Sequence, residues 1–196
     1  MDLDFDKEIV LENARVLIRP LVSEDTNSLL NVATEDKNLN RFSPIQVSSH
    51  ELLSQYIEIS LKDRRQGLRY PFAIYDKHLN AYAGSTSFLN ISNRDKRLEI
   101  GATWIGNQFQ RTGLNRNCKF LLLSHAFDHL EFERVELKTD ERNIKSRAAI
   151  EAIGGQQEGI LRSHTVMSDG FRRNTVYYGI LSGDWTDLKR RLEATL

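Results

Sequence analysis

A strand, a polar loop, a long helix and a second strand follow one another between residues 96 and 139. Residues 96–105 alternate in polarity, as a half-buried strand does. One face of this strand is expected to carry Leu98, Ile100, Ala102 and Trp104, and the other Glu99, Gly101, Thr103 and Ile105. Apolar residues four apart then predict a helix from about Gly113 to Leu130, and a strand follows. A helix between two strands of one sheet makes a crossover, so part of the sheet is parallel or mixed.

The remaining strands lie on both sides of this crossover. They are predicted at residues 15–20, 70–76, 81–91, 158–167 and 175–181. Helices are predicted at residues 23–33, 48–65 and 143–153, the last closed by Gly154 in a left-handed cap. Short turns before residue 96 predict an antiparallel meander. The element order βααβββαβαββ therefore predicts an α+β (mixed α/β) fold with seven strands, in a single domain 1–196 whose core is about 15–181.

Composition limits the class of partner. Lys plus Arg and Asp plus Glu are both 27, so the formal net charge is zero and a general nucleic-acid binder is not expected. One cysteine, Cys118, excludes an intrachain disulfide and a multi-cysteine zinc site. No apolar run approaches the length of a membrane span, and the acidic first residues lack the pattern of a targeting signal. A cytoplasmic protein without membrane contact is expected.

The loop before the long helix holds a single glycine, Gly113, among polar residues. Exposed N–H groups and the positive dipole end make a helix N-terminus a ready anion site. A P-loop is excluded because Leu114 and Asn115 follow Gly113 where Lys and Ser/Thr are needed, and the Gly-x-Gly-x-x-Gly dinucleotide fingerprint is absent. The alternative is an ordinary helix start with no ligand.

The same loop resembles motif A of the GNAT acyl-CoA N-acetyltransferases, Gln/Arg-x-x-Gly-x-Gly/Ala, in the form Gln110-Arg-Thr-Gly113-Leu-Asn115. The resemblance covers about residues 15–181. Asn143-Ile-Lys-Ser146, followed by Gly154, is similar to the family's Asn-x-x-Ser/Ala helix. Residues 158–162 and 175–181 look like the RimJ/RimL-type branch, which acetylates protein N-termini. The resemblance implies a GNAT-type fold, with a central mixed, mostly antiparallel sheet flanked by helices.

The resemblance also implies acetyl-CoA as co-substrate and no metal. Its pyrophosphate is expected on the N–H groups of Arg111, Thr112, Gly113, Leu114 and Asn115. Gln110, Arg116 and Lys119 lie nearby in the sequence as further cofactor contacts. The pantetheine arm is expected along Trp104 and Ile105, with Asn143 as a contact or as the cap of its helix. Asn115 departs from the family's Gly or Ala but keeps its backbone N–H.

Three side chains are candidates for proton transfer. Glu99 stands at the spacing before Gln110 at which several family members carry a general base; the alternative is a structural or ion-paired carboxylate. His164 is a second candidate base, or else a structural histidine. Many family members place a proton-donating tyrosine seven residues after the asparagine, where this chain has Ile150. Ser146 is then the candidate acid.

The function expected is direct transfer of acetyl from acetyl-CoA to a primary amine in a ternary complex. A protein or peptide N-terminus is the favoured acceptor because of the resemblance to the RimJ/RimL-type branch. An α-amine also demands less of a base than a lysine amine does. The alternatives are a small-molecule amine, such as an amino acid, polyamine or antibiotic, and a non-catalytic CoA-binding sensor. A homodimer is a possible state, and a buried Cys118 is expected rather than a covalent nucleophile.

Overall fold

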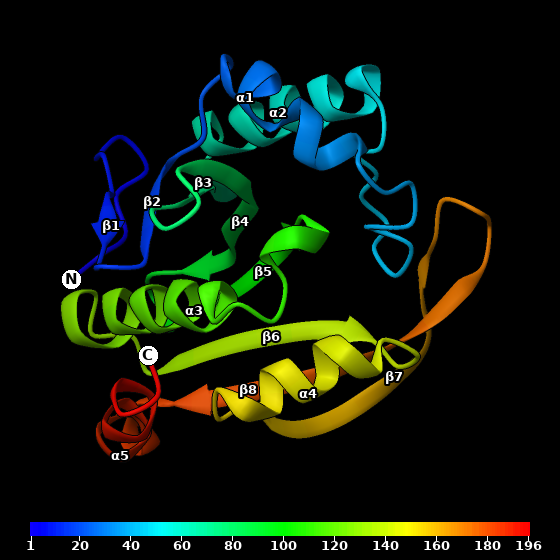
Figure 1. The fold of residues 1–196 in the computed structure, drawn as a ribbon. Helices are drawn as coiled ribbons and strands as arrows, with labels where there is room; N and C mark the ends of the chain where they lie inside the picture. Colours follow the sequence, from blue (N-terminus) through cyan, green and yellow to red (C-terminus); the bar gives the residue numbers. More distant parts are fainter.

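Eight strands form one sheet in the computed structural model, which describes residues 1–196 (Figure 1). The strands are β1 (Leu11–Glu12), β2 (Val16–Pro20), β3 (Arg69–Asp76), β4 (Ala81–Ser92), β5 (Arg97–Ile105), β6 (Arg134–Asp140), β7 (Gln156–Val166) and β8 (Arg172–Leu181). The helices are α1 (Asp25–Thr34), α2 (His50–Arg65), α3 (Leu114–Ser124), α4 (Ile144–Ala152) and α5 (Ser182–Glu193). A 3₁₀ turn (Asn107–Phe109) precedes α3, and a π-helical turn (His125–His129) follows it.

The strand order is β1-β2-β3-β4-β5-β6-β8-β7, and only β5 and β6 run parallel. The β3–β4–β5 meander and the β5–α3–β6 crossover predicted from the sequence are therefore confirmed. The predicted α+β fold with a mixed, mostly antiparallel sheet is also confirmed, although the sheet has eight strands rather than seven.

Two elements were missing from the prediction. Strand β1 has two residues, of which Leu11 pairs with Ile18, and so short a segment cannot show a period of two. Helix α5 buries Trp185, Leu188 and Leu192 on one face. The spacing of these three residues is helical, and it is the signal that could have identified α5 from the sequence.

Helices cover both faces of the sheet. Tyr56 of α2 reaches one face, where its hydroxyl lies 2.9 Å from Ser85 Oγ of β4. Lys119 of α3 reaches the opposite face, where its Nζ lies 3.4 Å from Thr86 Oγ1 of the same strand. Figure 1 shows α1 and α2 together on one side of β3 and β4, with α3 on the other. The core is thus built in two layers, one on each side of the sheet.

The predicted faces of β5 are wrong beyond Gly101. Gly101 pairs with Ser87 but Trp104 pairs with Ser85, so β5 holds one residue more than β4 between these pairs. Ala102 adopts a left-handed φ of 47° within this bulge. The extra residue reverses the alternation, and Trp104 lies on the same face as Gly101 instead of the opposite one.

Strand β5 separates from β6 just before this bulge. The two strands pair only over Arg97–Glu99 and Arg134–Glu136. Beyond Glu99, β5 continues to Ile105 with β4 as its sole strand partner, while β6 continues to Asp140 beside β8. A wedge with unpaired backbone on both sides therefore opens inside the sheet, with Glu99 at its vertex.

The connection between α1 and α2, residues 35–49, reaches the tip of the β7–β8 hairpin. Arg173 Nη1 of β8 donates to the carbonyl oxygen of Phe42 at 2.9 Å. The Arg142 guanidinium lies 5.6 Å from the Phe42 ring centroid and 3.9 Å from that of Phe171. Figure 1 shows this connection beside the hairpin on the open side of the wedge. These contacts cover the wide end of the wedge, opposite its vertex at Glu99.

None of the helices combines the length and the apolar composition that crossing a bilayer requires.

Candidate active site

The N-terminus of α3 presents a group of free backbone N–H donors. Gly113 adopts φ 88° and Arg111 φ 60°, and both left-handed conformations turn the chain sharply into the helix. A Cβ on Gly113 would meet nothing within 4 Å, so the space above the glycine is open. The N–H groups of residues 111–113, 115 and 116 donate to no backbone or side-chain acceptor, while the Leu114 N–H contacts Thr112 Oγ1 at 3.4 Å. This geometry fits an anion.

Side chains of the loop hold its shape. Gln110 Nε2 donates to the carbonyl oxygen of Ile105 at 2.9 Å, and the Thr112 hydroxyl donates to that of Phe109 at 2.7 Å. Arg116 Nη1 donates to the carbonyl oxygen of Thr195 at 3.3 Å, which draws its guanidinium toward the C-terminal end. Gln110 and Thr112 therefore hold the backbone of the anion site in place through these two hydrogen bonds. Arg111 is exposed and forms no ion pair, so its charge is available to phosphate.

The predicted pantetheine edge is the unpaired side of β5. Trp104 pairs with Ser85 and Ile105 with Gly84 on the β4 side only. The Trp104 side chain is buried against Tyr56 of α2, so what Trp104 can offer a ligand in the wedge is its backbone. The Ile105 carbonyl already accepts from Gln110.

Glu99 lies at the vertex of the wedge and is 6% exposed. Its Oε2 accepts from Asn90 Nδ2 at 2.6 Å and pairs with Lys138 Nζ at 2.7 Å. Its Oε1 accepts no hydrogen bond, and a Cβ built on Gly101 would lie 2.9 Å from it. One carboxylate oxygen is therefore fixed by two donors, and the other lies over the splayed part of β5. Glu99 can therefore form its ion pair with Lys138 through Oε2 and still take part in proton transfer through Oε1.

Lys138 and Tyr177 belong to this site but were missed from the sequence. Burial alone would lower the pKa of Lys138, but the hydrogen bond and the charge of Glu99 raise it above its usual value. Lys138 Nζ also lies 4.7 Å from the centroid of the Tyr177 ring, and the two residues pair across β6 and β8. The available signal was the alternation of β6, which places Lys138 opposite its apolar face.

His164 lies at the edge of this cluster and not beside Glu99. Its ring centroid is 5.8 Å from that of Tyr177, which stands between His164 and Lys138. Its Nδ1 lies 3.1 Å from Thr175 Oγ1. The side chain is exposed on β7, on the open side of the wedge. The structure therefore brings Glu99, Lys138 and Tyr177 together. Of these three residues, His164 lies beside Tyr177 only.

Asn143 and Ser146 form the start of α4. Asn143 Oδ1 accepts from the Ser146 N–H at 3.1 Å, so the predicted cap is present. The Ser146 side chain is half-buried, and its hydroxyl bonds to no residue of the chain. Ile150, one turn further on, is buried in the core.

Replacing Asn143 by Ala should destabilise the protein by about 1 kcal/mol, because the N-cap acceptor is lost. Asn143→Asp keeps an acceptor oxygen at the same place and should lie close to the wild type. Chemical unfolding of the three proteins measures the difference. Equal stability of the Ala and Asp variants would contradict a capping role.

Lys119 is directed away from the anion site. Its Nζ lies 2.7 Å from Thr103 Oγ1, beneath β4 and β5, and no carboxylate pairs with it. The phosphate contact expected for Lys119 is therefore not formed. Burial lowers the pKa of Lys119 from 10.5 to about 8, and burial raises that of the neighbouring Cys118 thiol to about 11. Cys118 is a buried core residue, as expected, and not an activated nucleophile.

Because the folded protein holds the Lys119 proton less tightly than the unfolded chain does, its charge destabilises the fold fully below about pH 8. This cost is relieved as the pH rises from about 8 to 10.5. Lys119→Met should stabilise the protein by about 2 kcal/mol at pH 7, after allowance for its lost hydrogen bonds, and the advantage should vanish near pH 10. Unfolding titrations at both pH values, with exposed Lys62→Met as the control, measure this. A pH-independent difference would contradict the assignment.

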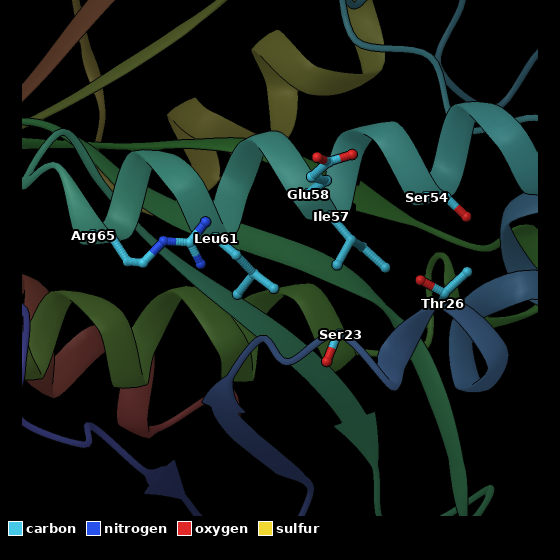
Figure 2. A pocket seen from close by; sticks show the side chains of 7 residues that line it. All are labelled: Ser23, Thr26, Ser54, Ile57, Glu58, Leu61 and Arg65. Atoms are coloured by element: carbon cyan, nitrogen blue, oxygen red, sulfur yellow. The ribbon is translucent and has the colours of Figure 1, made fainter.

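Figure 2 shows an open hollow of about 180 Å³ between α2 and the start of α1. The hollow is lined by Ser23, Thr26, Ser54, Ile57, Glu58, Leu61 and Arg65. It contains none of the residues of the wedge or of the α3 N-terminus, and no site residue predicted from the sequence. It is a surface feature separate from the candidate active site.

The two features together fit acetyl-CoA. Free N–H groups and an open glycine at the start of α3 suit a pyrophosphate, and the unpaired edge of β5 suits an extended arm with amide groups. The carboxylate of Glu99 stands where both strands meet. No residue of the chain fills the space above Gly113.

Comparison with known proteins supports this fit. The acetyltransferase (GNAT) domain family matches residues 15–156. YdaF of Bacillus subtilis, provisionally named a ribosomal N-acetyltransferase, is 33% identical over 112 residues, which are 57% of this chain and 58% of YdaF. The match thus spans little more than half the length of that relative. A provisionally named acetyltransferase structure from T. thermophilus is 32% identical, with a TM-score of 0.86 over 95% of this chain and 96% of its own.

A solved structure of RimJ from Mycobacterium smegmatis, in complex with CoA-disulfide, shares the fold at 19% identity. Its TM-score is 0.80, over 96% of this chain and 93% of that chain. The family match covers well over half of the residues, and the T. thermophilus structure covers nearly all of them. The chain therefore belongs to the GNAT acetyltransferase family, as an N-acetyltransferase whose fold implies the use of acetyl-CoA.

Proposed function

We propose that this protein transfers an acetyl group from acetyl-CoA to the N-terminal α-amine of a protein or peptide, by direct attack in a ternary complex. The observation that carries the proposal is the wedge between β5 and β6, with the free oxygen of Glu99 at its vertex and the free N–H groups of α3 beside it. The names of YdaF and RimJ favour a protein acceptor.

Different residues bind different parts of acetyl-CoA in this proposal. The N–H groups of residues 111–115, with the charge of Arg111, bind the pyrophosphate, and the backbone of Trp104 and Ile105 aligns the pantetheine arm. Gln110 and Thr112 fix the loop, and Arg116 and Asn143 are further proposed contacts for the cofactor. Acetyl-CoA supplies the activated thioester when it is bound.

Proton transfer falls to the chain's own side chains. Glu99 Oε1 accepts the proton that the acceptor ammonium must lose before its nitrogen can attack. Lys138 and Asn90 hold the carboxylate in place through Oε2. Ser146, whose hydroxyl has no partner in the chain, directs a proton to the departing thiolate. His164 provides a second basic group on the exposed face of β7, from which the released proton reaches solvent.

Two matched peptides test the acceptor class. One has a free α-amine and no lysine, and the other has a blocked α-amine and one lysine. An α-amine has a pKa about 2.5 units below that of a lysine amine, so at pH 7.5 the first peptide should be acetylated much faster. A faster reaction of the lysine peptide would overturn the proposed acceptor. Activity on a polyamine or antibiotic alone, with neither peptide modified, would favour the small-molecule alternative.

A further inference from the structure

Arg69 is a buried cation without an anion. The side chain lies on β3 beneath α2 and is 5% exposed. Its Nε donates to Ser87 Oγ at 2.8 Å and its Nη2 to the Tyr56 hydroxyl at 2.7 Å. No carboxylate of the chain pairs with it. A guanidinium taken out of water without a counter-ion is costly. Its cation–π contact with the Tyr56 ring, 4.9 Å from the ring centroid, offsets only part of that cost.

The neighbours of Arg69 are all neutral. The Tyr56 hydroxyl accepts from Arg69 and hydrogen-bonds to Ser85 Oγ at 2.9 Å, and Ser85 Oγ in turn donates to the carbonyl oxygen of Phe72 at 2.7 Å. The chain of donors runs away from the guanidinium and ends on a backbone oxygen. Arg69 Nη1 donates to nothing in the protein, and it is not among the atoms sealed from solvent.

A second donor beside Tyr56 also has no partner. Trp104 Nε1 is buried and donates to no atom of the chain. The Trp104 and Tyr56 rings meet edge to face, with centroids 6.3 Å apart. Buried polar groups are nearly always hydrogen-bonded, so the unpaired Trp104 Nε1 lacks an acceptor. Together with the solvent-accessible Arg69 Nη1, it leaves two donors beside Tyr56 free for the acceptor atoms of a ligand.

Arg69 lies on the same sheet face as Glu99. Arg69 pairs with Leu89, and Leu89 pairs with Glu99, so all three point to one side. The guanidinium extends along the sheet to Ser87, and Glu99 Oε1 extends to Gly101. Ser87 and Gly101 are paired neighbours on β4 and β5, whose backbones lie about 5 Å apart, and the Leu89 side chain also reaches Gly101.

The two opposite charges do not neutralise each other. Glu99 pairs with Lys138, and no ion pair joins it to Arg69. A ligand with a primary ammonium and a carboxylate a few bonds apart would bridge the two positions, with its nitrogen at Glu99 Oε1 and its carboxylate at Arg69 Nη1. Such a pair of groups occurs in a peptide that begins with Asp or Glu, and also in a free amino acid.

We propose that Arg69 determines acceptor specificity by binding a carboxylate that lies close to the acceptor amine. This inference rests on the proposed acetyl transfer and adds the chemical class of the acceptor. In a protein substrate the carboxylate belongs to an acidic N-terminal residue. Arg69 contacts the substrate without exchanging a proton with it.

Matched peptides that begin with Asp or Asn, and otherwise identical, test the proposal on the unmodified enzyme. The Asp peptide should be acetylated with a kcat/KM about ten- to a hundredfold higher, mainly through a lower KM. Equal kcat/KM for the two peptides would overturn the role of Arg69 while leaving the acetyltransferase proposal intact. If no amine is acetylated although acetyl-CoA binds, the proposed function itself fails.

Arg69→Gln should bring the Asp peptide down to the rate of the Asn peptide and leave the latter unchanged. Arg64→Gln is the matched control, because Arg64 also lacks a carboxylate partner but lies in the last turn of α2 and donates to the carbonyl oxygen of Phe5. It should preserve the preference for Asp. Unaltered acetyl-CoA binding by both variants shows that they are folded. Loss of the preference in Arg64→Gln and not in Arg69→Gln would contradict the assignment.

A parallel assay with free glutamate and its amide, glutamine, distinguishes the two sources of the carboxylate. Both carry an α-carboxylate, so similar acetylation of the two, lost in Arg69→Gln, identifies a free amino acid as the ligand. Acetylation confined to the Asp peptide identifies a protein N-terminus.

Discussion

Gly113→Asp is expected to weaken acetyl-CoA binding about a hundredfold. Its carboxylate would lie among the free N–H groups of residues 111–113, 115 and 116, which are expected to donate to the pyrophosphate. Losing about two charge-assisted hydrogen bonds, of about 1.5 kcal/mol each, corresponds to about 3 kcal/mol, and every 1.4 kcal/mol is tenfold in Kd. Isothermal titration with acetyl-CoA measures the change.

The matched control is Gly113→Asn. Asn has nearly the same size as Asp and both tolerate the left-handed φ of 88° better than other side chains, so the backbone strain is similar. Nothing lies within 4 Å of the new Cβ in either variant. The difference between the two variants therefore reports the charge alone. Equal affinity of the Asp and Asn variants would show that this helix end does not bind the pyrophosphate.

Glu99→Gln is expected to lower kcat/KM for the amine by about a hundred- to a thousandfold, which is the usual contribution of a general base. The amide keeps the shape of the side chain but cannot take up a proton at Oε1. Acetyl-CoA affinity should stay the same, because the anion site lies at α3 and not at the vertex of the wedge. Steady-state kinetics together with titration separate the two effects.

A purely structural role of Glu99 has a different signature. Lys138→Gln breaks the same ion pair from the other side while leaving the carboxylate in place. If Glu99 only holds the strands together, the two variants should lose similar activity and similar stability. If Glu99 is the base, Glu99→Gln should lose far more activity than Lys138→Gln. A Glu99→Gln enzyme with full activity removes Glu99 from the mechanism.

Local signals predicted much of this molecule. The meander and the crossover follow from alternation and helical spacing, and the Asn143 cap follows from a residue type at a helix start. The glycine at 113 also has a local cause, because its left-handed φ is needed where the loop enters α3. Each of these features depends on residues near one another in the chain.

The missed features depend on contacts between distant segments. The bulge after Gly101 places a left-handed φ on Ala102, a residue type that gives no sign of it, and so Trp104 lies on the other face. Lys138 joins Glu99 only because β5 and β6 are neighbours in the sheet. The isolation of Arg69 from every carboxylate is likewise a property of the assembled sheet.

The central claim is acetyl transfer to an amine at the wedge, and one incubation tests it most directly. The protein is mixed with heavy-isotope acetyl-CoA and a pool of peptides and small amines, and all species are then examined by mass spectrometry. The account predicts label on the α-amines of peptides and none on the protein itself, since the transfer is direct. Label on no amine, with acetyl-CoA bound in the same tube, would contradict it.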